Sequence, residues 1–342
     1  MTNKTGMKRS IIYRLILMLM TAGIFQGAIA QIDPHFSQYY VYPSYLNPAL
    51  TGAFAGQYRV AGIFRNQWSN VGSAYSTKGI SSDFTTDKNI NVGMSFMNQT
   101  VADAGYSSNA GYFNAAYTGV QLGEGQFNRL VFGMQLGFMH RRFNPAELTF
   151  GDQWTAGVGY NSALPTQEIL LNTSSGTLDV GAGVLYFNAD PSKAANVFVG
   201  ASMAHLNKPM EKFLTDTKTE IPQRLTVHGG VRLAVSPDLS ITPHVLYMMQ
   251  GTGREYMAGA NAEIRVKENT ALMGGLNYRF NEAATVYLGM VHKSITAGFS
   301  VDVNHTNLAR RAGGANSFEF SITYIKPRKS RNEEVEFVCP RL

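Results

Sequence analysis

Apolar and polar residues alternate with a period of two over much of this sequence, and this feature restricts its fold most. Residues 130–138, 225–235, 255–266 and 294–304 each place apolar side chains at every second position. Such alternation is typical of a β-strand with one apolar and one polar face. After the N-terminus, no run of about 18 apolar residues occurs, which excludes a bundle of membrane-spanning helices.

The length and number of these segments favour a membrane barrel. Most span about 10–15 residues, whereas strands in soluble sheets usually have about 5–6 and a tilted bilayer-spanning strand needs about 9–11. Closing the sheet into a barrel gives every backbone N–H and C=O group a hydrogen-bond partner, as a lipid environment requires. We therefore predict an all-β fold, a transmembrane antiparallel β-barrel of the outer membrane with about fourteen strands. A secreted β-sandwich or propeller array is the soluble alternative. The segments lie near 58–69, 75–86, 90–101, 106–122, 127–142, 176–189, 195–207, 222–236, 238–250, 254–268, 270–281, 283–292, 294–304 and 316–326.

The first 30 residues have the composition of a signal peptide. Four basic residues precede an apolar stretch at 15–25, and Ala28-Ile29-Ala30 forms a small-residue cleavage site. Without this segment, 25 basic and 23 acidic residues leave a net charge of +2 instead of +6, so a nucleic-acid role loses its support. Only 15% of the chain is charged, against about 25% in soluble domains, as expected when one face of each strand contacts lipid.

The remaining domain organisation follows from these segments. We expect a signal peptide at 1–30, a periplasmic or plug segment at 31–57, the barrel at 58–326 and a periplasmic tail at 327–342. The connections between strands alternate between short and long, with long ones at 143–175, 208–221 and 305–315. In bacterial barrels the short turns are periplasmic and the long loops extracellular, which predicts that both termini are periplasmic. Within the first long loop, the aromatic and polar mix of Asp152, Gln153 and Trp154 suits contact with another protein.

The two faces of the strands predict different surroundings. The apolar faces are expected to contact outer-membrane lipid, with aromatic girdles near strand ends at Tyr112, Tyr256, Tyr278, Phe280 and Tyr324. The polar faces are expected to line the lumen. Their charges either form structural ion pairs in a closed interior or line a path for a solute or polypeptide. These lumen candidates are Arg224, Arg232, Glu255, Glu263, Arg265, Arg279, Asp302 and Glu319.

The mature N-terminal segment, residues 31–57, interleaves tyrosines with prolines and does not alternate like a strand. Two interpretations stay open: a plug that enters the lumen, or a tail bound at the surface. Glycines within the predicted strands, such as Gly181 and Gly183, permit close approach of another backbone and would suit a plug.

The C-terminal tail carries basic residues followed by Glu333, Glu334 and Glu336. It is either a solvated extension or a docking segment for periplasmic partners. A single cysteine excludes a disulfide scaffold, and its thiol is either free or bridges to another subunit. The candidate docking residues are Arg328, Lys329, Arg331, Cys339 and Arg341.

No catalytic, metal or cofactor site is predicted. The sequence contains no H-E-x-x-H, G-x-S-x-G, P-loop or G-x-G-x-x-G motif. Its seven histidines are scattered, and none forms a pair at i and i+4. We therefore expect a non-enzymatic protein.

Three blocks near the mature N-terminus resemble the opening of the PorP/SprF family. They are the stretch from Gln31 to Tyr39, then Tyr45-Leu46-Asn47-Pro48-Ala49-Leu50-Thr51-Gly52, then Phe64-Arg65-Asn66-Gln67-Trp68. The Cys339-Pro340-Arg341 ending extends the resemblance along the mature chain. Ile32, inserted in the opening, and Leu342, in place of a terminal aromatic, depart from the family pattern. The matching positions are Asp33, Pro34, Phe36, Tyr39, Asn47, Pro48, Gly52, Arg65, Gln67 and Trp68.

The resemblance implies an outer-membrane component of the type IX secretion and gliding motility machinery. The resemblance also implies a non-enzymatic barrel that helps a cell-surface adhesin with a type-B C-terminal domain to reach the surface. Family members are linked to the periplasmic ring and to peptidoglycan-binding components. A fatty-acid-channel-type solute transporter, which also combines fourteen strands with an N-terminal plug, is the alternative.

The matching residues have either structural roles or direct partner contacts. We expect Asn47-Pro48 and Gly52 to set a fixed turn, Arg65 to pair within the lumen, and Trp68 to be an interface or packing anchor.

Overall fold

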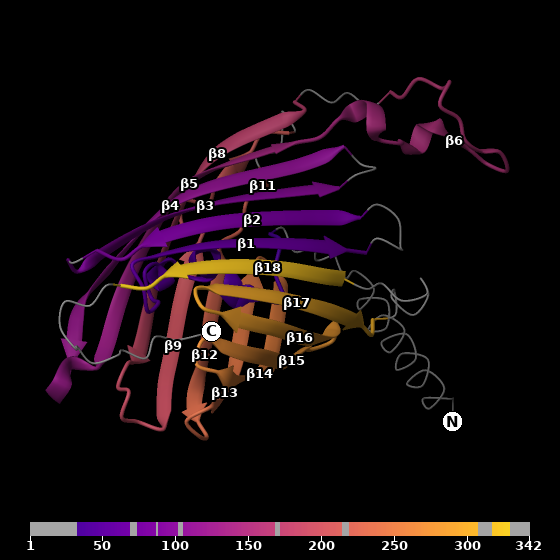
Figure 1. Ribbon diagram of the computed structural model, residues 1–342. Helices are drawn as coiled ribbons and strands as arrows, with labels where there is room; N and C mark the ends of the chain where they lie inside the picture. The colour runs from indigo at the N-terminus through magenta and orange to yellow at the C-terminus, as the bar shows by residue number, and fades with distance from the viewer. Residues whose placement is uncertain are drawn as a thin grey trace, which may run out of the picture. The chain divides into compact units, whose positions relative to one another are not determined.

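Fourteen strands close into one antiparallel barrel, which confirms the predicted fold class (Figure 1). The computed structural model describes residues 33–68, 74–86, 88–101, 105–167, 172–213, 219–306 and 317–328. The predicted signal peptide therefore lies outside the described residues. The barrel strands are β1 (Tyr58–Gln67), β2 (Tyr75–Phe84), β3 (Ile90–Val101), β4 (Tyr106–Leu122), β5 (Asn128–Arg142), β8 (Ser174–Asn188), β9 (Ala195–Ala204), β12 (Arg224–Ala234), β13 (Leu239–Gln250), β14 (Gly253–Lys267), β15 (Thr270–Arg279), β16 (Ala283–His292), β17 (Ile295–Asn304) and β18 (Ser317–Lys326).

The barrel closes where β1 pairs with β18 in antiparallel register, from Tyr58 opposite Lys326 to Gln67 opposite Ser317. We call the end that holds Tyr58 and Lys326 the turn end, and the opposite end the loop end. The loop end carries two short hairpins that the sequence did not predict, because each of their strands has only two residues. They are β6 (Trp154–Thr155) with β7 (Gly159–Tyr160), and β10 (Met210–Glu211) with β11 (Thr219–Glu220). Within the described parts of the chain, no helix has the length and apolar character needed to cross a membrane.

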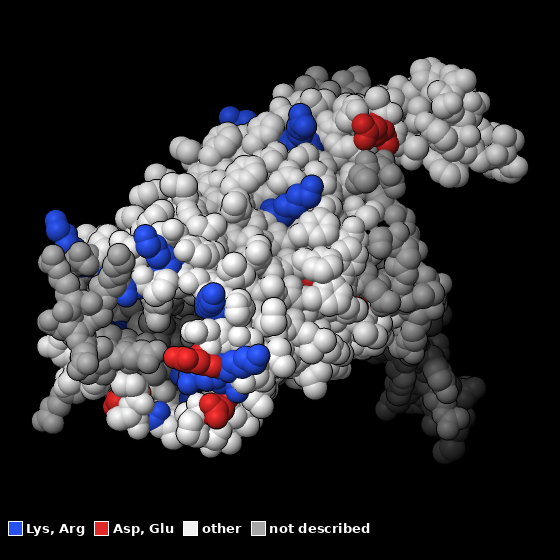
Figure 2. All heavy atoms as spheres, viewed as in Figure 1, with Lys and Arg blue, Asp and Glu red and all other residues white. Residues whose placement is uncertain are grey.

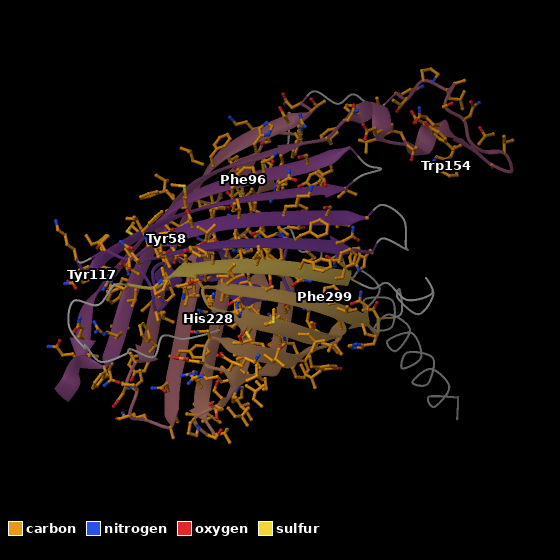
Figure 3. All side chains as sticks on the ribbon, viewed as in Figure 1. Tyr58, Phe96, Tyr117, Trp154, His228 and Phe299 are labelled. Carbon is orange, nitrogen blue, oxygen red and sulfur yellow. The ribbon has the colours of Figure 1, made fainter. Side chains whose placement is uncertain are left out.

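The outward faces of the strands are apolar around the barrel. Met134, Leu178, Leu276 and Leu288 are each more than 60% exposed, and Figure 3 shows Phe96 on the same outward face. Exposed apolar side chains at this density require a lipid environment.

One predicted girdle residue is wrong. Tyr112 points into the barrel, where its hydroxyl donates to Asp179 Oδ2 at 3.0 Å. In β4, Tyr112 lies on the same inward face as Ala110, Asn114 and Ala116. Its aromatic character therefore did not indicate which face of the strand it occupies.

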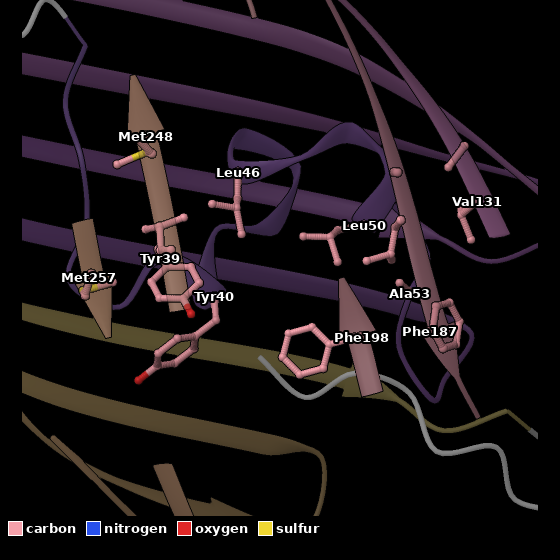
Figure 4. Packing of buried hydrophobic residues seen from close by; sticks show 14 of the residues in the cluster. Tyr39, Tyr40, Leu46, Leu50, Ala53, Val131, Phe187, Phe198, Met248 and Met257 are labelled. Carbon is pink, nitrogen blue, oxygen red and sulfur yellow. The ribbon is translucent and has the colours of Figure 1, made fainter. Parts of the chain in front are cut away.

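Residues 33–57 lie inside the barrel. They contain three short helical elements, η1 (Tyr39–Val41), α2 (Pro43–Leu46) and η2 (Pro48–Leu50). We call this stretch the luminal segment. Its element η2 packs against β4, β5, β8 and β9. The main buried apolar cluster joins the segment to the wall: Figure 4 shows Leu46 and Leu50 gathered with Phe187 and Phe198 of β8 and β9. The luminal segment is therefore packed against this part of the wall.

The luminal segment runs from the loop end to the turn end. At its start, Asp33 contacts Gln250 and Arg224, which lie at the loop-end termini of β13 and β12. At its finish, the Gln57 N–H donates to the Lys326 carbonyl at 2.7 Å. β1 begins and β18 ends at the turn end, whereas Asp33, the first described residue, lies at the loop end. The location of both termini in the periplasm stays a prediction, because the terminal residues lie outside the described part of the chain.

Candidate functional site

Glu319 of β18 holds the backbone of the luminal segment. Its two carboxylate oxygens accept the N–H groups of Ser37 at 2.7 Å and Gln38 at 2.8 Å. The Gln38 side chain adds a hydrogen bond to Ser300 Oγ at 2.9 Å and accepts one from Ser321 Oγ at 2.7 Å. All three wall residues belong to β17 and β18, so this side of the barrel provides a fixed seat for residues 37 and 38.

Two buried arginines complete this seat. Arg65 of β1 pairs with Glu319 and, at 2.9 Å, with Asp302 of β17. Arg65 and Arg279 of β15 both donate to the Ser37 hydroxyl, which in turn donates to Asp302 Oδ2 at 2.7 Å. Both guanidinium groups are buried. These charges therefore form ion pairs inside the barrel, and Arg65 pairs in the lumen as predicted.

Asp33 is the centre of a second ion-pair network, at the loop end. Its Oδ2 lies 2.7 Å from His205 Nε2 and 2.9 Å from Arg224 Nη1, and its Oδ1 lies 3.5 Å from Arg141 Nη2. His205 Nδ1 lies 3.0 Å from Asp179 Oδ1 on the opposite side of the ring. A single carboxylate of the luminal segment thus joins β5, β12 and the connection after β9.

The network holds Asp33 and His205 in their charged forms. Burial opposes ionisation of Asp33, but His205, Arg224 and Arg141 hold its pKa well below the usual range. Burial also opposes protonation of His205, but Asp33 and Asp179 raise its pKa to about 9. A protonated imidazole between two carboxylates is therefore present at neutral pH.

Asn47 is the anchor of the middle of the luminal segment. Its Oδ1 accepts the Ala49 N–H at 2.9 Å, which caps η2 as the predicted fixed turn. Its Nδ2 donates to the Val184 carbonyl of β8 at 3.0 Å and lies 3.2 Å from His228 Nε2 of β12. Pro48, at the first position of η2, needs no backbone donor there.

Glycines in the wall make room for this turn. A Cβ on Gly133 would lie 2.1 Å from the Ala49 nitrogen, and one on Gly183 would lie 2.1 Å from Asn47 Oδ1. The backbone of another segment thus approaches closely at Gly133, whereas Gly183 makes room for the Asn47 side chain. The alternation in 130–138 placed Gly133 on the polar face, but it was not among the glycines expected to admit a plug.

Gly52 forms the turn that leads out of the lumen. It has φ +76°, a conformation that favours glycine, and its N–H donates to Asp83 Oδ2 at 2.7 Å. Asp83 also pairs with Arg59 at 2.7 Å. Gly52 is thus fixed to β1 and β2 at the turn end.

The aromatic family positions pack inside the barrel. Phe36 stacks edge-on against Tyr42 at 5.8 Å, and Tyr39 against His244 at 5.7 Å. The Pro34 carbonyl accepts the Tyr45 hydroxyl at 2.8 Å. Each of these contacts fixes the luminal segment to itself or to the wall.

The last two family positions lie at the loop end of β1. Gln67 Oε1 accepts from Arg65 Nε at 3.3 Å. Trp68 has φ +62° and packs edge-on against Tyr75 at 5.5 Å, which supports a packing role.

One group could offer ligands to a metal ion. The ligand atoms of His35, Glu255 and Glu282 lie within 4.8 Å of one another. However, Arg279 pairs with Glu255 at 3.1 Å and with Glu282 at 3.0 Å. Both carboxylates already face a guanidinium, so we assign the group to the ion-pair network.

The predicted outer-loop residues lie together at the loop end. Asp152 Oδ2 accepts the Gln167 N–H at 2.6 Å, and Gln153 Nε2 donates to the Leu164 carbonyl at 2.9 Å. Trp154 is 58% exposed and its ring lies 6.0 Å from that of Tyr160 (Figure 3). Asp152 and Gln153 therefore shape the loop, and Trp154 is the exposed member.

Of the predicted tail residues, only Arg328 is described. Its guanidinium donates to Thr85 Oγ1 at 3.2 Å and to the Thr86 carbonyl at 3.3 Å, at the turn end. Lys329, Arg331, Cys339 and Arg341 lie outside the described residues.

Ser37 and Gln38 were not singled out by the sequence, although they make several of the strongest contacts of the segment. Their partners Asp302 and Glu319 are more than 260 residues away. No local pattern links such positions.

The family of the chain follows from comparison with known proteins. The family model of the type IX secretion system membrane protein PorP/SprF matches residues 28–324. No curated protein matches the chain. Solved structures similar to it include the toluene transporter TbuX of Ralstonia pickettii (9% identity, 81% of this chain and 91% of that one, TM-score 0.48), the toluene transporter TodX of P. putida (10%, 83% and 93%, 0.47) and the monoaromatic hydrocarbon channel CymD (10%, 85% and 94%, 0.48). The chain belongs to the PorP/SprF family and is an outer-membrane component of the type IX secretion system.

Proposed function

We propose that this barrel holds a secreted, adhesin-type cargo protein with a type-B C-terminal domain at its loop end, on the cell surface. The observation that carries the proposal is the filled lumen. Residues 33–57 are joined to the wall by ion pairs and hydrogen bonds near both ends. A barrel sealed in this way acts through its surfaces and needs no open channel.

The orientation belongs to the same proposal. The long connections 143–173 and 205–223 lie at the loop end, while the turn end carries short turns such as Lys293-Ser294. In outer-membrane barrels the longer loops are extracellular. The loop end would then face outward. The turn end and the tail would face the periplasmic ring and peptidoglycan-binding components.

Trp154 is the proposed contact for the cargo. Figure 1 shows β6 on a hairpin that extends beyond the barrel. Val158 at its tip is 78% exposed and Tyr160 is 43% exposed. Exposed aromatic side chains with apolar neighbours are frequent energetic centres of protein interfaces. A gliding role would follow if the cargo is a motility adhesin.

Surface display in cells tests the proposal. Deletion of the gene should leave the cognate adhesin off the surface, as measured by protease shaving of intact cells. The Trp154→Ala variant should weaken cargo binding by about 30-fold or more, which corresponds to loss of about 2 kcal/mol. The Trp154→Phe control should keep most of the binding.

Two results would contradict the proposal. Normal adhesin display in the deletion strain would reject a role in surface anchoring. Saturable uptake of an apolar solute by the purified barrel in liposomes, without co-purification of any adhesin, would favour the transporter alternative.

A further inference from the structure

A cavity lies at the turn end of the barrel, between the luminal segment and the wall. It has a volume of about 490 Å³, within the range of about 300–1,000 Å³ common for binding sites. Tyr40, Leu50 and Phe54 of the segment form one apolar side, and Met273 and Val291 of β15 and β16 lie opposite. The cavity therefore offers apolar surface in a barrel whose other luminal surface is mostly polar.

Basic side chains surround the same cavity. Arg232, Arg265 and Lys293 line it together with one carboxylate, Glu263. A fourth lining cation, Arg59, is paired with Asp83. Figure 2 shows charged side chains gathered around a hollow at this end, whereas the wall is largely uncharged. The site thus combines apolar walls with an excess of positive charge, which suits an acidic and apolar peptide.

The chain itself carries such a peptide in its C-terminal tail. Pro327 lines the cavity, and Arg328 is bonded to the Thr85–Thr86 turn beside it. Fourteen further residues follow, and 333–338 read Glu-Glu-Val-Glu-Phe-Val. The five-residue spacer from Arg328 to Glu333 can span up to roughly 17 Å. The acidic stretch therefore starts within reach of the cavity.

We propose that residues 333–338 dock in this cavity within the same chain. Their carboxylates would face Arg265 and Lys293, and the Phe337 side chain would pack against the apolar side formed by the luminal segment. The proposal does not depend on the identity of the cargo.

Photo-crosslinking in the full-length protein tests this docking. With p-benzoylphenylalanine in place of Phe337, we expect crosslinks within one chain to cavity residues such as Met273, Val291 or Ile325, identified by mass spectrometry. Combining this substitution with Arg265→Glu and Lys293→Glu should lower the yield at least fivefold. Lys267→Glu, which changes an exposed lysine outside the cavity, is the matched control and should leave the yield unchanged.

A tail variant avoids any effect on barrel folding. Changing Glu333, Glu334 and Glu336 to Gln together should lower the crosslink yield as much as the cavity variant does. Crosslinks between two copies, crosslinks outside the cavity, or an equal loss in the Lys267→Glu control would each overturn the proposal.

Discussion

The seat formed by Glu319 gives the sharpest prediction, for the Glu319→Gln variant. The side chain keeps its shape but loses its charge, and one carboxylate oxygen becomes an NH₂ group. The N–H group of either Ser37 or Gln38 then faces this NH₂ group, which cannot accept its hydrogen bond. Arg65 keeps only Asp302 as its counter-charge. Removing one partner of a buried ion pair typically costs about 3–5 kcal/mol. Because Arg65 keeps Asp302, we expect the lower limit, about 3 kcal/mol.

Hydrogen exchange measures this loss directly. A cost of about 3 kcal/mol lowers the protection factor by about 150-fold. We expect this change in peptides that cover residues 36–46, while peptides from β4 and β5 keep wild-type exchange. Glu268→Gln, in the exposed turn between β14 and β15, is the matched control and should change nothing. Wild-type protection of residues 36–46 in Glu319→Gln would refute the role of Glu319 as the seat of the luminal segment.

The remaining predictions concern the loop-end network and the wall glycines. The pKa of His205 is raised from 6.5 to about 9, so its contribution to holding the segment is complete below pH 6.5 and disappears as the pH rises through 9. The pKa of Asp33 is lowered from 3.8, so its contribution disappears only in acid. The hydrogen-exchange protection of residues 33–38, corrected for the intrinsic exchange rate, should therefore fall between pH 7 and pH 10. The His205→Gln variant should lose this pH dependence, and an unchanged pH profile in that variant would contradict the ion-pair assignment. Gly133→Ala places a Cβ 2.1 Å from the Ala49 nitrogen and should displace η2, seen as rapid proteolysis of the luminal segment in the intact barrel, whereas Gly62→Ala, with its nearest neighbour at 3.7 Å, should behave as wild type.

The sequence alone determined the barrel wall. The period of two shows which residues of a strand face lipid and which face the lumen, because neighbouring side chains point to opposite sides of a sheet. Segment length then separates a membrane barrel from a soluble sheet. The expected strands at 75–86, 90–101 and 283–292 agree with β2, β3 and β16 to within two residues. The exception was Tyr112. It was expected to contact lipid because it is a large aromatic residue near a strand end, but its position in the alternation of β4 places it on the inward face.

Only the tertiary structure decided what fills the lumen. Alternation placed Arg224, Asp302 and Glu319 on the polar face, but it contains no information about which charge meets which across a closed barrel. The partners Glu319 and Gln38 are 281 residues apart, and they meet because the luminal segment lies inside the barrel against β18. Local periodicity is a property of neighbouring residues, whereas the ion pairs that hold the segment exist only after all fourteen strands are in register.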